Sequence, residues 1–190
     1  MTKKELRTIY KEKRIALSSK DKLKLDDLML LQLQQLYFDE DVTTLLTYWP
    51  MANMNEPNTH LFTSYLRHTI PGLRIAYPVA DFATNTMQAM LIHEDTVYTT
   101  GQYGITQPKE GILLPADEID LVFVPLLICD KQGYRVGYGK GFYDKYLAQC
   151  RQDIISIGYN YFAPVDKIED ANEFDVPLNY CITPDNIYEL

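Results

Sequence analysis

The sequence LVFVPLLICDKQGYRVGYGKGFYDKYL, residues 121–147, decides the fold. Its apolar beginning, residues 121–124, ends at Pro125 and is typical of a strand buried on both faces of a parallel sheet. Glycines follow at positions 133, 137, 139 and 141, where the backbone can adopt positive φ and approach a ligand closely. Residues 142–147 predict a helix that continues to about Arg151. The order of strand, glycine-rich loop and helix indicates a ligand site on a central strand.

The glycine-rich loop has the features of a phosphate site. Gly139, Lys140 and Gly141 are expected at the N-terminus of the following helix, where free N–H groups and the helix dipole favour a phosphate. Arg135 and Lys140 add positive charge. The loop is not a Walker A motif, because no Gly-Lys-Ser/Thr ends it, and it is not a GxGxxG directly after a strand. A glycine-rich turn at a sheet edge, with Lys140 solvated, is the alternative interpretation.

The string RVGYGKGFYDKYL, preceded by VPLLICDKQG, resembles the signature of the 5-formyltetrahydrofolate cyclo-ligase family. The family pattern is Pro, a short apolar stretch, Asp, two residues, Gly, one residue, and then Arg-x-Gly-x-Gly-x-Gly-aromatic-Tyr-Asp. This chain keeps all of these fixed positions. It departs at Leu126, where the family usually has glycine after the proline. The resemblance implies an enzyme that cyclises 5-formyltetrahydrofolate to 5,10-methenyltetrahydrofolate with ATP and Mg²⁺, releasing ADP and phosphate.

A second matching motif lies near the N-terminus. Apolar side chains at helical spacing predict an amphipathic helix over residues 3–17. Lys3, Arg7 and Arg14 lie beside its apolar stripe at spacings of four and seven, which stacks the three cations on one flank. A solvated charged flank is the alternative. The Lys-x-x-Leu-Arg formed by Lys3, Leu6 and Arg7 resembles the family's other ATP-contacting motif.

The chemistry that the resemblance implies is phosphoryl transfer. That reaction depends mainly on alignment and charge stabilisation, so the site needs cations, backbone amides and a metal more than a general base. Lys140, Arg135 and Tyr143 are therefore expected to be catalytic. The residues expected to bind ATP are Lys3, Lys4, Leu6, Arg7, Arg135, Gly137, Tyr138, Gly139, Lys140, Gly141, Phe142 and Tyr143.

Other positions resemble the family's folate and magnesium contacts. The segment EPNT, which begins at Glu56, matches a Glu-x-x-Thr motif whose glutamate contacts the folate; an acid at a helix start, stabilised by the dipole, is the alternative. Met51 and Tyr138 are the other expected substrate contacts. Asp144 and Asp175 are expected to hold Mg²⁺ together with phosphate oxygens, because carboxylates are hard oxygen ligands. An ordinary first-turn acid and an ordinary turn residue are the respective alternatives.

Two further departures favour a competing hypothesis. Gln107 replaces the usual acid of a Gly-Ile-x-Glu-Pro turn, and the glutamine that normally follows the strand at residues 154–159 is missing from NYFAPVD. Together with Leu126, they favour a nucleotide-binding module of the same fold that does not turn over folate. Release of phosphate that depends on the formylated folate distinguishes the enzyme from the module.

Alternating strands and helices indicate the fold class. This alternation is typical of a mostly parallel sheet flanked on both faces by helices. The resemblance implies a single-domain, three-layer Rossmann-like α/β fold. The expected strands are residues 42–49, 74–78, 87–92, 121–124 and 154–159, and the expected helices are residues 3–17, 23–37, 142–151 and one after Glu56.

Composition sets the remaining bounds. With 190 residues and 46% hydrophobic content, the chain is long enough for one well-buried domain, residues 1–190. The net charge of −8 argues against broad nucleic-acid binding. The three cysteines have no CxxC spacing, so neither a disulfide framework nor a zinc site is indicated. No apolar run approaches the ~20 residues of a membrane span. We therefore expect a cytoplasmic monomer that acts on a small folate, with neither nucleic acid nor membrane as a partner.

Overall fold

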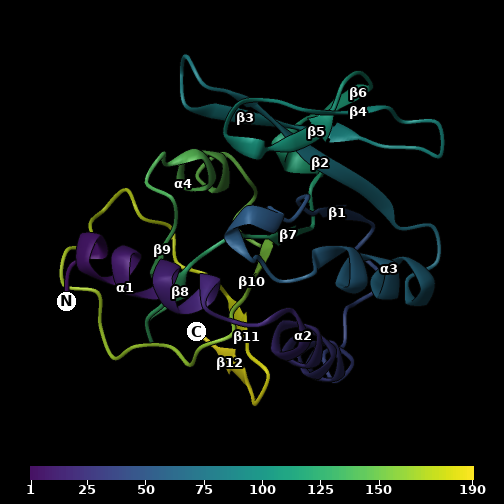
Figure 1. Ribbon diagram of the computed structural model, residues 1–190. Coiled ribbons are helices and arrows are strands. Elements are labelled where there is room, and N and C mark those ends of the chain that lie inside the picture. The colour runs from purple at the N-terminus through teal and green to yellow at the C-terminus, as the bar shows by residue number, and fades with distance from the viewer.

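The computed structural model describes all of residues 1–190 and has a central sheet of eight strands (Figure 1). The strands are β1 (Thr44–Leu46), β2 (Arg74–Asp81), β3 (Thr86–Leu91), β6 (Ile112–Leu114), β7 (Leu121–Phe123), β10 (Ile155–Tyr159), β11 (Tyr180–Ile182) and β12 (Ile187–Glu189). Their order across the sheet is β12-β11-β10-β7-β1-β2-β3-β6. Strands β11, β10, β7, β1 and β2 are parallel neighbours. At the two edges, β12 pairs antiparallel with β11, β3 with β2, and β6 with β3. The fold is thus mixed α/β with a mostly parallel sheet, as the sequence predicted.

Alternate side chains of the central strands face opposite sides of the sheet. Leu45 and Leu121 belong to one buried cluster, and Leu46 and Val122 belong to another. This two-residue period is what a strand imposes, and burial on both sides explains why these strands are apolar without alternation. Helices α2 (Ser19–Leu33) and α3 (Thr59–Thr69) cover the first face, while the shorter α4 (Phe142–Leu147) covers the second (Figure 1).

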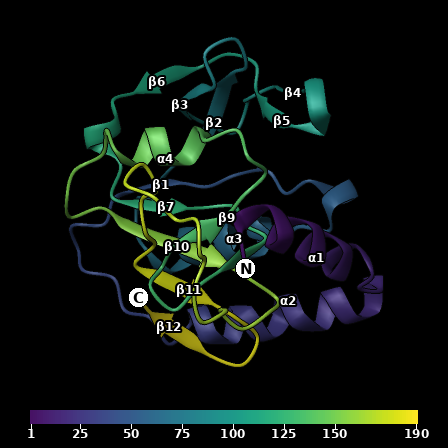
Figure 2. The same ribbon diagram turned by 90° about the vertical axis from the view of Figure 1, so that its left-hand side faces the viewer.

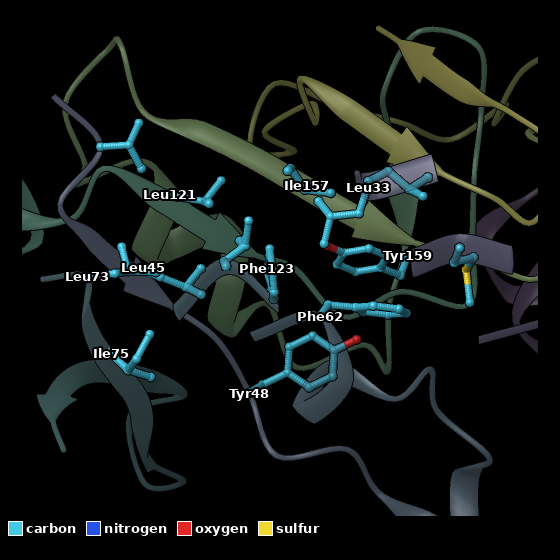
Figure 3. Close-up of a cluster of buried hydrophobic side chains, with 14 of the residues drawn as sticks. Leu33, Leu45, Tyr48, Phe62, Leu73, Ile75, Leu121, Phe123, Ile157 and Tyr159 are labelled. Atoms are coloured by element: carbon cyan, nitrogen blue, oxygen red, sulfur yellow. The ribbon is translucent and has the colours of Figure 1, made fainter. Parts of the chain in front are cut away.

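An aromatic stack lies at the centre of the first cluster (Figure 3). The rings of Phe62 and Tyr159 stack with centroids 4.1 Å apart, and Phe123 meets Tyr159 edge-on at 4.9 Å. Such pairs contribute about 0.5–1.5 kcal/mol beyond their buried area. Tyr48 belongs to the same cluster and also lines the cavity described below. The aromatic core therefore lies directly behind one wall of that cavity.

The N-terminal helix α1 (Lys3–Ile15) packs on a small hairpin and not on the sheet. Strands β8 (Ile128–Cys129) and β9 (Arg135–Val136) form this hairpin, and Leu6 packs against Ile128 and Val136. Thr2 caps the helix in a capping box with Glu5. The helix therefore brings its polar flank alongside the glycine-rich loop, which follows β9 directly.

The other side of the cavity is a β-rich region. Strands β4 (Tyr98–Thr100) and β5 (Thr106–Pro108) form a ribbon beside β2, and the backbone N–H of Ala80 donates to Gln107 Oε1 at 3.1 Å. Gln107, which stands where the family usually has an acid, therefore forms a structural hydrogen bond with β2. Figures 1 and 2 both place α4 between α1 and the region of β2 to β6. Three short 3₁₀ segments complete the chain: η1 (Ala52–Met54), η2 (Gln102–Gly104) and η3 (Ala116–Glu118).

Several element boundaries differ from the sequence-based expectation. The Ser18–Asp21 spacing, typical of a capping box, indicated the start of the second helix, and the Ser18 side chain does accept from the Asp21 N–H. The helix covers residues 19–33 instead of the leucine-rich run 23–37. The first strand is limited to residues 44–46, and α4 ends at Leu147 instead of near Arg151. Arg151 instead donates to the Asp117 carbonyl and to the Asp120 carboxylate, which holds the chain on its path into β10. None of the helices has the length and apolarity that a membrane crossing requires.

Candidate functional site

A cavity of about 710 Å³ lies between α1, the glycine-rich loop, the η1 loop and the region of β2, β3 and η2. Twelve of its 27 lining residues are hydrophobic, so the cavity combines apolar walls with a few polar groups, as small-molecule sites commonly do. The site residues predicted from the sequence that line it are Lys3, Arg7, Met51, Glu56, Arg135, Gly137, Tyr138, Gly139, Lys140, Gly141, Phe142, Tyr143, Asp144 and Asp175.

Two predicted residues do not line the cavity. Leu6 is 1% exposed and belongs to the small core between α1 and the β8–β9 hairpin, so it fixes the position of the helix. Lys4 is exposed to solvent. The Lys-x-x-Leu-Arg motif therefore contributes two cations to the cavity, Lys3 and Arg7, and one apolar anchor beneath them.

The glycine-rich loop has the predicted positive φ at two of its three alternate glycines, and Gly137 is the exception. Gly139 and Gly141 have φ values of 91° and 73°, in the left-handed region that favours glycine. A Cβ atom on Gly139 would lie 3.5 Å from the guanidinium carbon of Arg7, and Arg7 Nε donates to the Gly137 carbonyl at 2.8 Å. Lys140 Nζ lies 5.3 Å from the centroid of the Tyr103 ring. The loop therefore presents cations from two elements to one end of the cavity.

Two carboxylates at this end are paired with cations. Asp144 Oδ1 accepts from Arg135 Nη2 at 2.9 Å and from the Val176 N–H at 3.0 Å. Lys3 Nζ donates to both carboxylate oxygens of Asp175, at 2.6 and 2.5 Å. Burial lowers the pKa of the Arg135 guanidinium, and the charge of Asp144 opposes that shift. Because Asp144 is bonded to the residue after Asp175, the two carboxylates predicted to hold a metal lie in the same corner.

Glu56 lies at the other end, where it is 3% exposed. Its Oε2 accepts from the Met51 N–H at 2.7 Å, and its Oε1 accepts from the Tyr138 hydroxyl at 2.6 Å. Burial raises the pKa of Glu56, and the Met51 amide, the Tyr138 hydroxyl and the positive charge of Arg14 oppose the shift. Asn58 caps α3, so Glu56 precedes the helix and is not an acid of its first turn. Its carboxylate faces the cavity instead.

Sequence reasoning assigned no contact to several groups that line or support the cavity. Arg14 is 2% exposed and donates to the Tyr138 hydroxyl, although the sequence placed it only on a flank of cations. Tyr48 lines the cavity with 5% exposure. The side chain of Phe82 contacts the rings of both Tyr103 and Phe142, with centroids 5.4 and 5.5 Å apart. Aromatic residues are common in cores, so only the tertiary structure separates these from other apolar positions.

The departures from the family pattern have structural counterparts. A Cβ atom on Gly158 would lie 2.2 Å from Leu126 Cδ2, so Leu126 fills the space that a side chain in β10 would need. The Leu126 carbonyl also accepts from Arg14 Nη1 at 2.8 Å. After β10, the Asn160 side chain accepts from the Phe162 N–H, and residues 160–166 do not line the cavity. The missing glutamine is therefore not replaced by a neighbour in that segment.

Comparisons with known proteins agree with this architecture. The family model described as the 5-formyltetrahydrofolate cyclo-ligase family matches residues 1–184. A 5-formyltetrahydrofolate cyclo-ligase from Mycoplasma pneumoniae is 27% identical over 184 residues, which cover 96% of this chain and 98% of that protein. The cyclo-ligase from Haemophilus influenzae is 37% identical over 87 residues, and this match spans about half of each protein, 44% of this chain and 46% of that one.

A solved structure gives the same result. The NMR structure of Aquifex aeolicus 5,10-methenyltetrahydrofolate synthetase is similar to this one with a TM-score of 0.80 at 27% identity. The similarity covers 100% of this chain and 93% of that one. Sequence and fold therefore agree over nearly the whole chain, and the protein belongs to the 5-formyltetrahydrofolate cyclo-ligase family.

Proposed function

We propose that this protein is a single-domain, monomeric enzyme that cyclises 5-formyltetrahydrofolate to 5,10-methenyltetrahydrofolate, consuming ATP and requiring Mg²⁺. The observation that carries the proposal is one continuous cavity with two chemically different ends. One end gathers Lys3, Arg7 and Lys140 around a glycine-rich loop, and the other holds the buried carboxylate of Glu56 among aromatic rings. Family membership supports the assignment of the two ends to ATP and to the folate.

The reaction explains why both ends are needed. A formamide oxygen is a poor leaving group, so it is first activated by transfer of the γ-phosphoryl group of ATP. The N10 nitrogen of the folate then attacks the activated carbon, and phosphate departs. Phosphoryl transfer requires that donor and acceptor be aligned and that developing negative charge be stabilised. A single cavity that holds both substrates supplies that alignment.

The cationic end is suited to a triphosphate. Lys3, Arg7, Arg135 and Lys140 would neutralise the phosphates, and the N–H groups of residues 137–141 would bind phosphate oxygens. We assign the catalytic role to Lys140 and Arg135, which would stabilise charge on the transferred group, and to Tyr143. Burial raises the pKa of Tyr143, so its hydroxyl stays neutral, and Tyr143 is one of the residues that line the cavity.

The acidic corner fits a magnesium ion. Mg²⁺ is commonly bound through one or two carboxylates together with substrate phosphates, and Asp144 and Asp175 are two such carboxylates. No group of three or more His, Cys, Asp or Glu side chains is arranged to bind a metal, which agrees with a site that phosphate oxygens complete. The bound ion would neutralise phosphate charge, and Asp144 and Asp175 would orient it.

The opposite end is suited to a flat heterocycle with N–H donors. Glu56 offers carboxylate oxygens at the cavity wall, and Met51 and Tyr138 lie beside it. The surrounding walls are aromatic and aliphatic, which favours a planar ring. We therefore assign folate recognition to Glu56, Met51 and Tyr138.

Phosphate release tests this proposal against the alternative of a nucleotide-binding module. The purified protein is mixed with Mg-ATP, with and without 5-formyltetrahydrofolate, and inorganic phosphate is followed in time. The proposal predicts phosphate release only when the formylated folate is present. Release of phosphate at the same rate without the folate, or ATP binding with no release in either mixture, would contradict it.

A further inference from the structure

Arg14 is buried behind the cavity wall, although it belongs to the polar flank of α1. Its residue exposure is 2%, and its guanidinium donates in three directions. Nε donates to the Met54 carbonyl and Nη1 to the Leu126 carbonyl, both at 2.8 Å, and Nη2 donates to the Tyr138 hydroxyl. A buried guanidinium is costly unless its donors are satisfied, and here each outer nitrogen has a partner. Arg14 thereby joins three segments that line the folate end.

The hydrogen-bond directions in this network are fixed by the chemistry of its members. A guanidinium has donors only, and an ionised carboxylate has acceptors only. The Tyr138 hydroxyl, placed between Arg14 and Glu56, must therefore accept from Arg14 and give its single proton to Glu56 Oε1. Arg14 orients the phenol, and the phenol in turn orients the carboxylate.

The same turn of α1 also holds the loop that carries Met51 and Glu56. The Asn55 side chain donates to the carbonyls of Arg14 and Leu17 at 2.9 and 3.1 Å. Asn55 itself has a φ of 52°, a left-handed conformation that asparagine adopts more readily than most other non-glycine residues, and it ends the η1 segment. With the Arg14 bond to Met54, the loop is fixed to α1 through three hydrogen bonds.

We propose that Arg14 is a positioning residue for the substrate, which holds Tyr138 and Glu56 in the geometry that recognises the folate. This inference rests on the proposed function. The ATP end depends on the opposite end of α1, where Leu6 is buried, Lys3 pairs with Asp175 and Arg7 bonds to Gly137. Arg14 reaches the ATP end only through Tyr138, whose backbone belongs to the loop assigned to phosphate, so loss of the Arg14 side chain should affect the folate end more strongly than the ATP end.

Steady-state kinetics of three variants tests the selectivity. Arg14→Gln removes the charge and most of the donors, Arg14→Lys keeps the charge but loses the planar fork, and Lys13→Gln is the control. Lys13 is exposed and lies only over the Tyr10 ring. For Arg14→Gln we expect at least a tenfold higher KM for 5-formyltetrahydrofolate and a KM for ATP within threefold of wild type. Arg14→Lys should be intermediate and Lys13→Gln unchanged.

The pKa of Glu56 is a second measurement, and it would not change if Arg14 had only a structural role. The charged and titratable groups that face Glu56 are Arg14 from α1, Lys22 from α2, and Tyr48, Tyr138, Tyr143 and Tyr161. Because Arg14 is positive and orients Tyr138, Arg14→Gln should raise the pKa of Glu56 above its wild-type value. The carboxyl carbon resonance of labelled glutamate, assigned by comparison with Glu56→Gln, measures this pKa. In Arg14→Lys the pKa of Glu56 should lie between the values of the wild type and of Arg14→Gln.

The outcomes separate this inference from the proposed function. An equal rise in both KM values, or a lower thermal midpoint with unchanged folate KM and unchanged Glu56 pKa, would show that Arg14 is a structural residue only. A wild-type protein that does not bind 5-formyltetrahydrofolate would overturn the proposed function and the substrate named here. In that case the Glu56 titration still decides whether Arg14 orients the carboxylate.

Discussion

Charged residues in the cavity occupy two different environments. Lys140 is exposed on the glycine-rich loop, where its ammonium lies over the Tyr103 ring. Glu56 is buried, with both carboxylate oxygens already hydrogen-bonded. An exposed cation contributes little to folding but is free to meet a ligand, whereas a buried carboxylate affects both stability and recognition. These environments lead to different expectations for substitutions at the two positions.

Replacing Lys140 should affect ligand binding without affecting stability. In Lys140→Ala we expect ATP affinity to fall about tenfold or more, because a charge-assisted contact to phosphate is lost. The thermal midpoint should stay within about 2 °C of wild type, since the side chain is exposed. Calorimetric titration with Mg-ATP measures the affinity, and Lys145→Ala, an exposed lysine on α4 outside the cavity, is the matched control. Unchanged affinity in Lys140→Ala would overturn the role assigned to this lysine.

Glu56 should give stability a specific dependence on pH. Because burial raises its pKa, the folded protein holds the proton more tightly than the unfolded chain does. The stability that this group contributes is therefore fully present below its unfolded pKa and is lost as pH rises through its folded pKa. Glu56→Gln removes the titration, so the wild-type free energy of unfolding should decline relative to the variant from about pH 4 to pH 7. Urea unfolding of both proteins across this range measures the two free energies of unfolding. A wild-type free energy that rises relative to that of Glu56→Gln as pH increases contradicts the prediction.

Residues that belong to local motifs could be predicted from sequence, and residues defined by distant partners could not. Gly139, Lys140 and Glu56 lie in short strings that resemble the family pattern, and the structure places all three on the cavity. Arg14 shows the limit. Its spacing placed it with Lys3 and Arg7 on the flank expected to border a cleft, but its three partners lie 40, 112 and 124 residues away, so the nearby sequence does not show its burial.

At the scale of elements, the glycine-rich loop depends on a few positions that only glycine fits. Gly139 combines positive φ with the close approach of Arg7, whereas Gly137 has neither positive φ nor any atom within 4 Å of a Cβ position. Two glycines of one loop, two residues apart, are thus under different constraints.

This contrast predicts unequal effects of alanine at the two positions. Gly139→Ala should destabilise the protein by about 1–2 kcal/mol, since a left-handed conformation carries that cost for a residue with Cβ. Gly137→Ala should change the free energy of unfolding by less than about 0.5 kcal/mol. Chemical denaturation of the two variants measures both values. Equal destabilisation would mean that the loop conformation differs from the one described.

Element type could be predicted more reliably than element boundaries. The apolar run at β7 and the alternation of strands and helices indicated a parallel sheet, and the structure confirms it. The boundaries depend on single contacts that periodicity does not encode. The capping pair of Ser18 and Asp21 at the start of α2 could be recognised from its spacing, whereas the Arg151 contacts that follow α4 could not. The β8–β9 hairpin was missed because its strands are two residues each, shorter than any period that a pattern can show.

In the molecule as a whole, the ion pair of Lys3 and Asp175 joins the N-terminal helix to a segment near the C-terminus, at one corner of the cavity. The pair spans 172 positions in sequence, and both side chains are less than one-fifth exposed. In the proposed enzyme both members have a second partner, since Lys3 would bind a phosphate and Asp175 would hold Mg²⁺. Binding of Mg-ATP would therefore replace a contact between distant segments with contacts to the ligand.

This exchange predicts how Mg²⁺ stabilises the protein with ATP. A ligand present at 100 times its dissociation constant stabilises the native state by about 2.7 kcal/mol, which is a rise of roughly 5–10 °C for a chain of this size. Wild-type protein should show a larger rise with Mg-ATP than with ATP and EDTA. Asp175→Asn should lose most of that difference.

Asp166→Asn is the control, because Asp166 also forms an ion pair with a lysine, an exposed pair with Lys131 at 2.6 Å outside the cavity. It should keep the full Mg²⁺-dependent rise. Thermal melts of the three proteins, with and without the metal, make the comparison. An Asp175→Asn variant that keeps the wild-type difference would exclude Asp175 as a metal ligand.

Absorbance in the methenyl band measures whether the protein turns over a formylated folate. Purified protein is mixed with 5-formyltetrahydrofolate, ATP and Mg²⁺, and parallel mixtures omit one component each. We expect the methenyl band to grow only in the complete mixture. A flat trace from folded protein that still binds ATP would contradict it and would leave a nucleotide-binding module without folate turnover.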